Sequence, residues 1–292
     1  MSRGQRQANK KIHRRPARSL YERDSFTQWM THPFTLSLSW VNDVLSERSL
    51  SVDTMTPEVF TTLFRALHGS LEYRSRPQTT FLWQLKKMSA DRYHREVTEH
   101  QKIYLKRGSN HDLLNALMWI SLPLTRDIAF EQMTVARDLR DPTTPDKRSR
   151  LEDRLTLFDE SGVVVISDRA DLLELIRDRS WIELFWNRRA EVLEHLEIWV
   201  TGHGLYEQLL TPFIGLVGYG RLYLLSSEEL GTHGVQKQRL IDLKVSRDLE
   251  RCSLDAPRAL HAIPILGYPR WYEANQERSF YENPKYFRGP YA

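Results

Sequence analysis

Hydrophobic positions recur at helical spacing along most of the chain. An apolar stripe from Val59 to Leu67 follows Thr56 and Pro57, which predicts a helix with Thr56 as its N-cap and Pro57 at its first position. The same spacing predicts four further helices, over residues 89–105, 110–122, 125–139 and 234–250. Helices therefore dominate the predicted secondary structure.

Strand patterns are few and lie in the second half of the chain. Two apolar runs, 155–158 and 163–166, flank Asp159-Glu160-Ser161-Gly162, which predicts a hairpin with both acids as ordinary turn residues. Residues 196–200 alternate like a strand, and a short helix to about Leu210 is expected after Gly202-His203-Gly204. Strands and helices do not alternate regularly. The expected fold class is therefore α+β, mainly helical with a small antiparallel β element.

The expected organisation is a disordered basic tail over residues 1–23 and a single globular unit over 24–292. Residues 141–150 contain two prolines and no apolar residue, so a candidate sub-domain boundary lies near 141–152. The segment 262–292 is rich in aromatic residues and is predicted to pack irregularly over the core. An aromatic-lined groove, or a surface for a protein partner, is the alternative for this segment.

Composition excludes several classes of protein. Among the 292 residues, 40% are hydrophobic, and no apolar run approaches the roughly 20 residues that cross a bilayer. The single cysteine, Cys252, excludes an intramolecular disulfide and a zinc site built from several thiolates. A protein without a transmembrane segment is therefore expected.

The net charge of +4 hides an uneven distribution. Residues 1–18 contain seven basic residues and no acid, so the remaining 274 residues carry a net charge of −3. Such a tail is either a solubilising extension or an arm that binds nucleic acid without sequence specificity. The basic residues of the tail are Arg3, Arg6, Lys10, Lys11, Arg14, Arg15 and Arg18.

Familiar catalytic motifs are absent, and two histidine-containing blocks carry the candidate chemistry. The sequence has no P-loop, GxGxxG, GxSxG or HExxH motif. In the first block, His111 and Asn115 lie four residues apart, on one face of a helix that Asn110 is expected to cap and that Asp112 suits at its start. These residues either form a pocket wall or satisfy one another as structural groups.

The second block is Gly202-His203-Gly204-Leu205-Tyr206-Glu207, at the predicted turn from strand to helix. His203 and Glu207 are four residues apart, so they share a helix face. They are candidates for a proton relay or for two ligands of a metal such as zinc. A hydrogen-bonded histidine at a helix start is the structural alternative.

Six ordered blocks resemble one bacterial family, domain of unknown function family 3025, from about residue 30 to 288. Residues 111–119 with Pro123 resemble its "HD..NAL.W...P" block, and 155–162 its "LT.FDE.G" block. Residues 184–186 match a short block, 202–207 resemble "GHALYE", and 263–271 and 280–288 resemble "LP.LG.PGW" and "FY......FR". Arg270 replaces a glycine of this pattern. The resemblance implies a bacterial cytoplasmic protein and assigns no catalytic residue.

The sequence favours an enzyme, a hydrolase or transferase, over a nucleic-acid-associated protein that uses its basic tail. The expected site joins His111, Asp112, Asn115, His203 and Glu207 around a small anionic ligand. In one version His203 is a general base that Glu207 orients, and Asn115 donates to an oxyanion. In the other a divalent metal is held by His111, Asp112 and His203. Both versions require the two blocks to meet in space.

Overall fold

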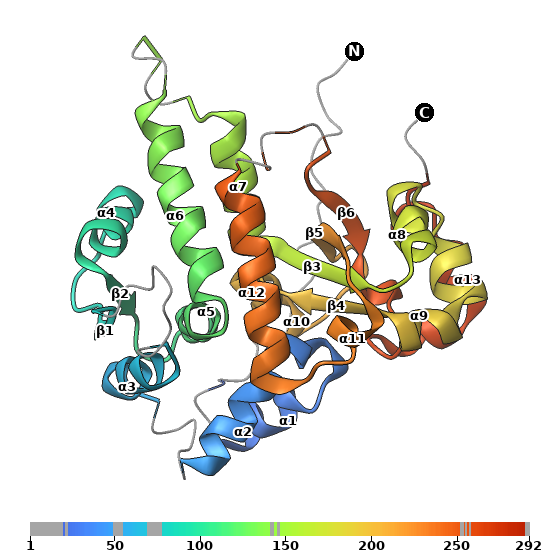
Figure 1. Ribbon diagram of the computed structural model, residues 1–292, viewed down its shortest axis with the longest axis horizontal. Helices are drawn as coiled ribbons and strands as arrows, with labels where there is room; N and C mark the ends of the chain where they lie inside the picture. The colour runs from blue at the N-terminus through green and yellow to red at the C-terminus, as the bar shows by residue number, and fades with distance from the viewer. Residues whose placement is uncertain are drawn as a thin grey trace, which may run out of the picture.

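A computed structural model describes residues 20, 23–48, 55–68, 78–140, 143–144, 147–251, 254, 256 and 258–289 (Figure 1). The basic residues of the tail and Cys252 lie outside this range. The mainly helical α+β fold is confirmed. No helix within the described residues combines the length and apolarity needed to cross a membrane.

A four-stranded sheet with the order β4-β3-β5-β6 forms the centre of the second half. Its strands are β3 (Gly162–Ser167), β4 (Leu196–Val200), β5 (Val217–Leu224) and β6 (His261–Pro264). The β3–β4 and β5–β6 pairs are antiparallel, whereas β3 and β5 run parallel. The sheet is therefore mixed. All six residues of β3 are buried, which explains its continuous apolar run.

A second, two-stranded sheet is parallel rather than antiparallel. It joins β1 (Thr80–Trp83) and β2 (Lys102–Leu105), which are connected through α4 (Ala90–His100). The helix predicted over 89–105 is therefore shorter than expected. It ends because Gln101 adopts a left-handed conformation, with φ of 54°, and the chain then turns into β2.

The other predicted helices form close to their expected positions. They are α3 (Pro57–His68), α5 (Asn110–Ser121), α6 (Pro123–Asp138), α10 (His203–Leu209) and α12 (Gly234–Glu250). The remaining helices are α1 (Arg23–Met30), α2 (Ser39–Glu47), α8 (Ala170–Arg177), α9 (Arg189–His195), α11 (Ser227–Leu230) and α13 (Arg278–Tyr281). Short turns of other helix types cover Pro33–Leu38, Glu183–Asn187, Ile265–Gly267 and Glu273–Gln276.

The predicted hairpin over residues 155–166 is wrong. Residues Arg150–Ser161 form helix α7, which runs directly into β3. Ser149 and Glu152 form a capping box that starts this helix: the Ser149 hydroxyl accepts from the Glu152 backbone amide, and the Glu152 carboxylate accepts from that of Ser149. Asp159 and Glu160 are therefore in the last turn of a helix instead of in a loop.

The two faces of the sheet are covered by different layers. Val164 and Ile166 belong to a core cluster with Ile241 and Val245 of α12. A larger cluster contains Val163 and Val165 of β3 and Ile198 and Val200 of β4. It also includes residues of the N-terminal helices and aromatic residues of the C-terminal segment. Helix α6 packs against both α12 and α7, and Figure 1 shows it between them and the β1–β2 pair.

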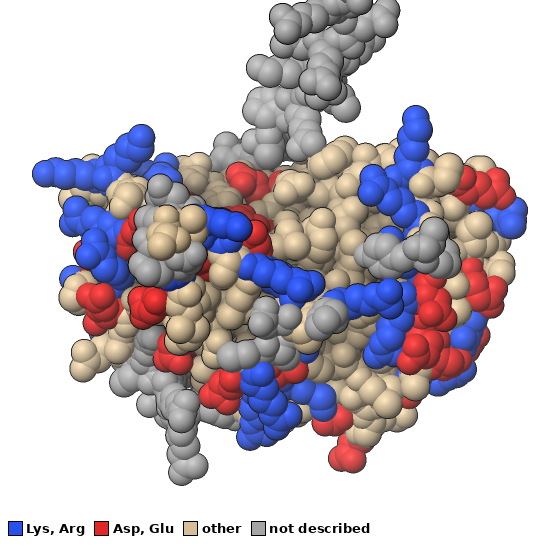
Figure 2. All heavy atoms as spheres, turned by 90° about the horizontal axis from the view of Figure 1, so that it is seen from above, with Lys and Arg blue, Asp and Glu red and all other residues tan. Residues whose placement is uncertain are grey.

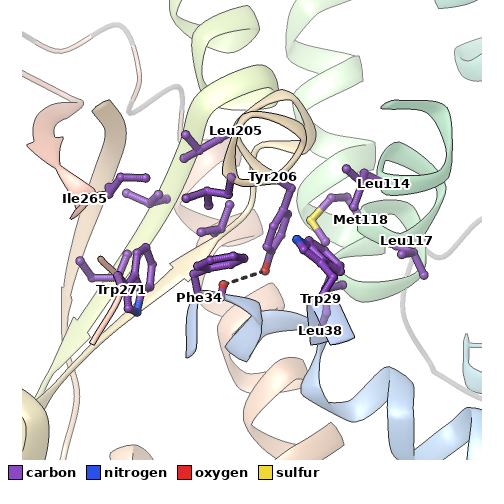
Figure 3. Packing of buried hydrophobic residues seen from close by; sticks show 14 of the residues in the cluster. Trp29, Phe34, Leu38, Leu114, Leu117, Met118, Leu205, Tyr206, Ile265 and Trp271 are labelled. Atoms are coloured by element: carbon purple, nitrogen blue, oxygen red, sulfur yellow. Dashed lines mark hydrogen bonds between the residues drawn. The ribbon is translucent and has the colours of Figure 1, made fainter. Parts of the chain in front are cut away.

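Tyr206 fixes α10 to the hydrophobic core (Figure 3). Its ring meets Trp29 edge-on, with centroids 5.4 Å apart, and its hydroxyl donates to the Phe34 carbonyl at 3.3 Å. Trp271 packs edge-on against Phe34 at 6.0 Å. Most of the C-terminal aromatic residues that the structure describes are buried, including Phe280 and Phe287, so they do not form an exposed partner surface.

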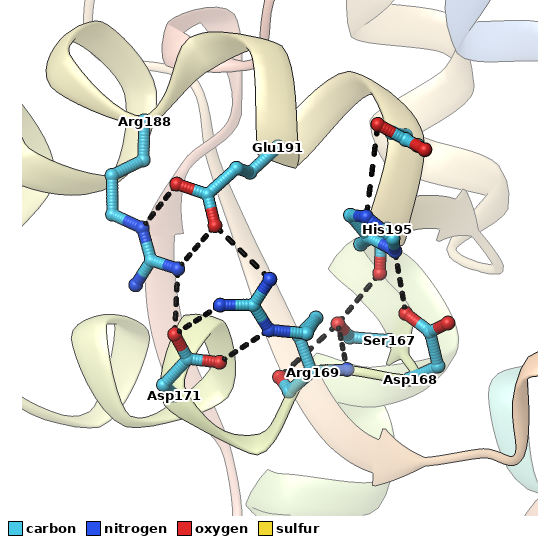
Figure 4. Close-up of polar contacts among 8 residues, drawn as sticks. Ser167, Asp168, Arg169, Asp171, Arg188, Glu191 and His195 are labelled. Atoms are coloured by element: carbon cyan, nitrogen blue, oxygen red, sulfur yellow. Dashed lines mark hydrogen bonds and ion pairs between the residues drawn. The ribbon is translucent and has the colours of Figure 1, made fainter.

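Polar contacts hold α8 and α9 at the far end of the sheet (Figure 4). Asp171 pairs with both Arg169 and Arg188, which also contact Glu191. The Ser167 hydroxyl at the end of β3 donates to the His195 carbonyl at 2.6 Å. This network ties the ends of β3 and β4 together, away from the two histidine blocks.

Candidate functional site

The two histidine blocks meet in space. His111 lies in the first turn of α5 and His203 at the start of α10, and both approach Glu160 at the end of α7. The Nε2 atoms of the two histidines are 3.1 Å apart, and their rings meet edge-on with centroids 4.4 Å apart. Residues 92 positions apart in the sequence therefore share one site.

The start of α5 is fixed differently from the prediction. Ser109, instead of Asn110, is the N-cap, and its hydroxyl accepts from the Asp112 backbone amide at 3.2 Å. Asn110 accepts from the Leu20 backbone amide at 2.8 Å. The buried Asp112 carboxylate accepts from the Lys106 backbone amide at 2.7 Å. Asp112 thus holds the turn before α5, and the acidic residue whose carboxylate comes together with the two histidines is Glu160.

The Nδ1 atom of each histidine faces an acceptor. His111 Nδ1 is 3.0 Å from the Glu207 carboxylate, and His203 Nδ1 is 3.0 Å from the Asp159 backbone carbonyl. The Glu207 carboxylate only accepts, so His111 Nδ1 carries the hydrogen. His203 Nδ1 lies between the Asp159 carbonyl, which accepts, and Arg126 Nη2, a donor 3.3 Å away. Glu207 therefore orients His111 and not His203, which corrects the predicted relay within α10.

When the His203 hydrogen lies on Nδ1, as the shorter contact with the Asp159 carbonyl favours, the two Nε2 lone pairs are directed at each other. Two lone pairs 3.1 Å apart repel unless a proton or a cation lies between them. The Glu160 carboxylate approaches the same point, with Oε1 3.6 Å from His203 Nε2. One ligand atom from each of His111, Glu160 and His203 lies within 4.8 Å of the others. Two neutral imidazoles and a carboxylate form a common donor set for a catalytic zinc ion.

Close approach of α7 to α10 brings Glu160 to this point. A Cβ atom on Gly202 would overlap the Glu160 backbone carbonyl and the Gly162 backbone nitrogen. A Cβ on Gly204 would overlap Oε2 of Glu160. The Gly-His-Gly sequence is therefore explained by the space that the end of α7 occupies beside it.

A buried arginine organises the wall behind His203. Arg126 of α6 forms an ion pair with Asp159, and its Nη2 donates to the Asn115 Oδ1 at 2.7 Å and lies 3.3 Å from His203 Nδ1. The Asn115 side-chain amide donates in turn to the Tyr93 hydroxyl at 3.1 Å. The Asn115 amide thus accepts from Arg126 and donates to Tyr93, and Asn115 also lines the cavity, so its predicted role as an oxyanion donor stays a prediction.

Burial sets the charge states of this group. Burial first, then the charge of Arg126 and the neighbouring His111, holds the pKa of His203 well below its usual range, so its imidazole is neutral near pH 7. Burial lowers the pKa of Arg126 to about 10, which leaves it a cation. Burial raises the pKa of Tyr93 to about 12, so its phenol keeps its hydrogen and can donate.

These groups border a cavity of about 350 Å³. The helices α4, α5, α6, α7 and α10 contribute its walls, and the turn that carries Lys106 lies at the histidine end. Side chains of His111 and Glu160 are 38% and 44% exposed, whereas that of His203 is 5% exposed. A ligand can therefore reach His111 and Glu160 directly while His203 forms the floor.

Four residues of this group were missed by the sequence reasoning, namely Tyr93, Arg126, Asp159 and Glu160. The two acids were assigned to a hairpin turn. The Ser149-x-x-Glu152 pattern, typical of a capping box, was the signal that would have placed them on a helix. Arg126 and Tyr93 carry no local signal, because only tertiary packing brings them to the histidines.

Comparison with known protein families identifies the family of this chain. A family model described as a protein of unknown function, DUF3025, matches residues 79–290. This chain belongs to the DUF3025 family. The matched range in this DUF3025 protein contains the whole of the candidate site. No curated protein and no solved structure gives a significant match.

The nucleic-acid alternative rests on residues outside the described range. Within that range, the face of the DUF3025 protein shown in Figure 2 has Lys and Arg interspersed with Asp and Glu around an uncharged area, and no continuous basic field. Binding of nucleic acid through the tail therefore stays a prediction from the sequence.

Proposed function

We propose that this protein is a metal-dependent hydrolase whose divalent ion, with zinc as the best match, is held by His111, His203 and Glu160. One observation carries the proposal: the two Nε2 atoms face each other at 3.1 Å, with both Nδ1 atoms engaged and a carboxylate beside them. Ligand atoms around tetrahedral zinc lie about 3.3 Å apart. The distances of 3.1 and 3.6 Å fall on either side of that value.

The surrounding contacts are those that metal-binding histidines use. A ligating histidine usually donates its other N–H to a carboxylate or a backbone carbonyl, which fixes the ring and makes it a better ligand. Glu207 fills this role for His111, and the Asp159 carbonyl fills it for His203. Three protein ligands leave a fourth position open to water on the cavity side.

The chemistry that fits is hydrolysis of an acyl compound. A divalent ion lowers the pKa of bound water and so supplies hydroxide near neutral pH. An ion held by His111, His203 and Glu160 would supply the hydroxide that adds to the carbonyl carbon, and the proton released by the water would go to the leaving group as its bond to that carbon breaks. Tyr93 is placed to donate to the carbonyl oxygen as negative charge develops there, and Arg126 and Asn115 hold its hydroxyl in place.

The test combines metal analysis with an assay. The full-length protein is stripped with a chelator, reloaded with Zn²⁺, and assayed on 4-nitrophenyl acetate, with bound metal measured by mass spectrometry. We expect one ion per chain, activity only in the loaded protein, and metal affinity at least about tenfold weaker in Glu160→Gln. Glu277→Gln makes the same charge change at an exposed position and is expected to match the wild type.

Two results would overturn the proposal. One is a correctly folded protein that takes up no stoichiometric metal, which would mean that a shared proton lies between the histidines. The other is equal metal affinity in Glu160→Gln, Glu277→Gln and the wild type.

A further inference from the structure

One wall of the cavity is apolar, while Gln84, Ser89 and Thr156 line other parts of it. Ala129, Phe130 and Met133 line it from α6, and Leu155 faces them from α7. The His94 ring stacks on Phe130, with centroids 5.2 Å apart and planes 9° apart. Because the His94 Nε2 is hydrogen-bonded to the Thr134 hydroxyl at 2.8 Å, this wall presents little free polarity to a ligand.

Charges around the cavity disfavour an anionic substrate. Among the described residues that line it, Lys106 and Arg137 are the cations, and Asp112, Asp159 and Glu160 are acids. Arg137 lies at the far end and already pairs with Asp91 at 3.3 Å and approaches Glu152 at 3.9 Å. A nucleotide or sugar phosphate would need several free cations, which this lining lacks.

The length of the cavity along α6 fits a substrate with an elongated side group. Along α6, the residues that line the cavity run from Ala129 to Arg137, a rise of about 12 Å over eight residues. The volume of about 350 Å³ lies at the lower end of the range for pockets that bind small molecules. The polar, reactive end and the apolar stretch thus lie in one continuous cavity.

We infer that the substrate is an uncharged acyl compound, a carboxylic ester or amide, whose alkyl or aryl group lies along Phe130 and Met133. Its carbonyl faces Tyr93 and the proposed ion. The inference rests on the proposed metal site and adds the class of molecule that the cavity takes.

Hydroxamates test this without requiring turnover, because their head group binds a divalent ion and their side group varies. The full-length protein is loaded with Co²⁺, and its visible spectrum is titrated with acetohydroxamate and with benzohydroxamate. We expect benzohydroxamate to bind at least about tenfold more tightly, because its ring buries apolar surface that acetohydroxamate lacks. In Met133→Asp the preference for benzohydroxamate is expected to fall below about threefold, since the new carboxylate would lie in the apolar wall that α6 contributes.

Val135→Asp is the matched control. Val135 is on the same helix but 48% exposed, and it does not line the cavity, so the preference is expected to stay at the wild-type value. A ratio near one in the wild-type protein, or equal ratios in the two variants, would overturn the substrate class while the Co²⁺ spectrum still supports the metal site. A protein that takes up no Co²⁺ would overturn both.

Discussion

Gly204 lies beside Glu160, so that a methyl group at residue 204 would overlap the carboxylate Oε2 and come within 3.1 Å of the Glu160 backbone oxygen. The Oε2 atom ends a flexible side chain, which can turn away at little cost. We therefore expect Gly204→Ala to fold with nearly wild-type thermal stability but to bind Zn²⁺ at least about tenfold more weakly, because one proposed ligand is displaced. Calorimetric titration with Zn²⁺ and thermal unfolding of the chelator-treated protein measure the two effects.

Gly202→Ala provides the contrast. There the new methyl group would overlap backbone atoms of Glu160 and Gly162, which cannot move without disturbing α7 and β3. This variant is expected to lose several degrees of melting temperature. If Gly204→Ala bound Zn²⁺ like the wild type, Glu160 would not be a ligand.

Tyr93 is expected to act on the reaction and not on the metal. Tyr93→Phe removes the hydroxyl that Asn115 positions and should lower kcat on 4-nitrophenyl acetate by about 100-fold, with KM and zinc content little changed. Tyr104→Phe is the control, since the Tyr104 hydroxyl also belongs to the cavity wall but donates to Glu96 at 3.2 Å. Equal rates in the two variants would remove Tyr93 from the mechanism.

Local patterns predicted the faces of the site but not its assembly. The four-residue spacings correctly put His111 with Asn115, and His203 with Glu207, on common helix faces. The actual partners cross between helices: Glu207 contacts His111, and Asn115 contacts Arg126 and Tyr93. Such contacts depend on how α5, α6 and α10 pack, which no local spacing encodes. Because the sequence predicted a hairpin in place of α7, Glu160 was not recognised as the proposed third ligand.

Glu152 makes stability depend on acid pH. Its hydrogen bonds to Arg140, with smaller contributions from Ser149, lower the pKa of the carboxyl to about 2, from 4.5 in the unfolded chain. The stabilisation is complete above about pH 4.5 and is lost as the pH falls toward 2. We expect it to contribute about 2 kcal/mol less to the free energy of unfolding at pH 3 than at pH 7.

Urea unfolding at the two pH values measures this change. Glu152→Gln should unfold about 3 kcal/mol more easily at pH 7, because it leaves the partly buried Arg140 without its anion, and should show a flatter dependence on pH. Asp153→Asn, at a neighbouring exposed carboxylate, should keep the wild-type slope. The same slope in Glu152→Gln as in the wild type would assign the acid sensitivity to other groups.

Arg270 adopts a left-handed conformation with φ of 70°, at the position where the family pattern has glycine. A side chain costs about 1 kcal/mol in that conformation. Arg270→Gly is therefore expected to raise the free energy of unfolding by about 0.5–1 kcal/mol, whereas Arg278→Gly within α13 should lower it. Chemical denaturation of both variants decides the matter, and a loss of stability in Arg270→Gly would mean that the arginine makes compensating contacts.

The most direct measurement is anomalous diffraction at the zinc absorption edge from crystals of the Zn²⁺-loaded protein. The metal proposal predicts one strong peak within about 2.3 Å of the Nε2 atoms of His111 and His203 and of a Glu160 carboxylate oxygen. It also predicts that the Nδ1 contacts with Glu207 and the Asp159 carbonyl persist. A well-ordered site with the two Nε2 atoms still in contact and no anomalous peak between them would contradict it.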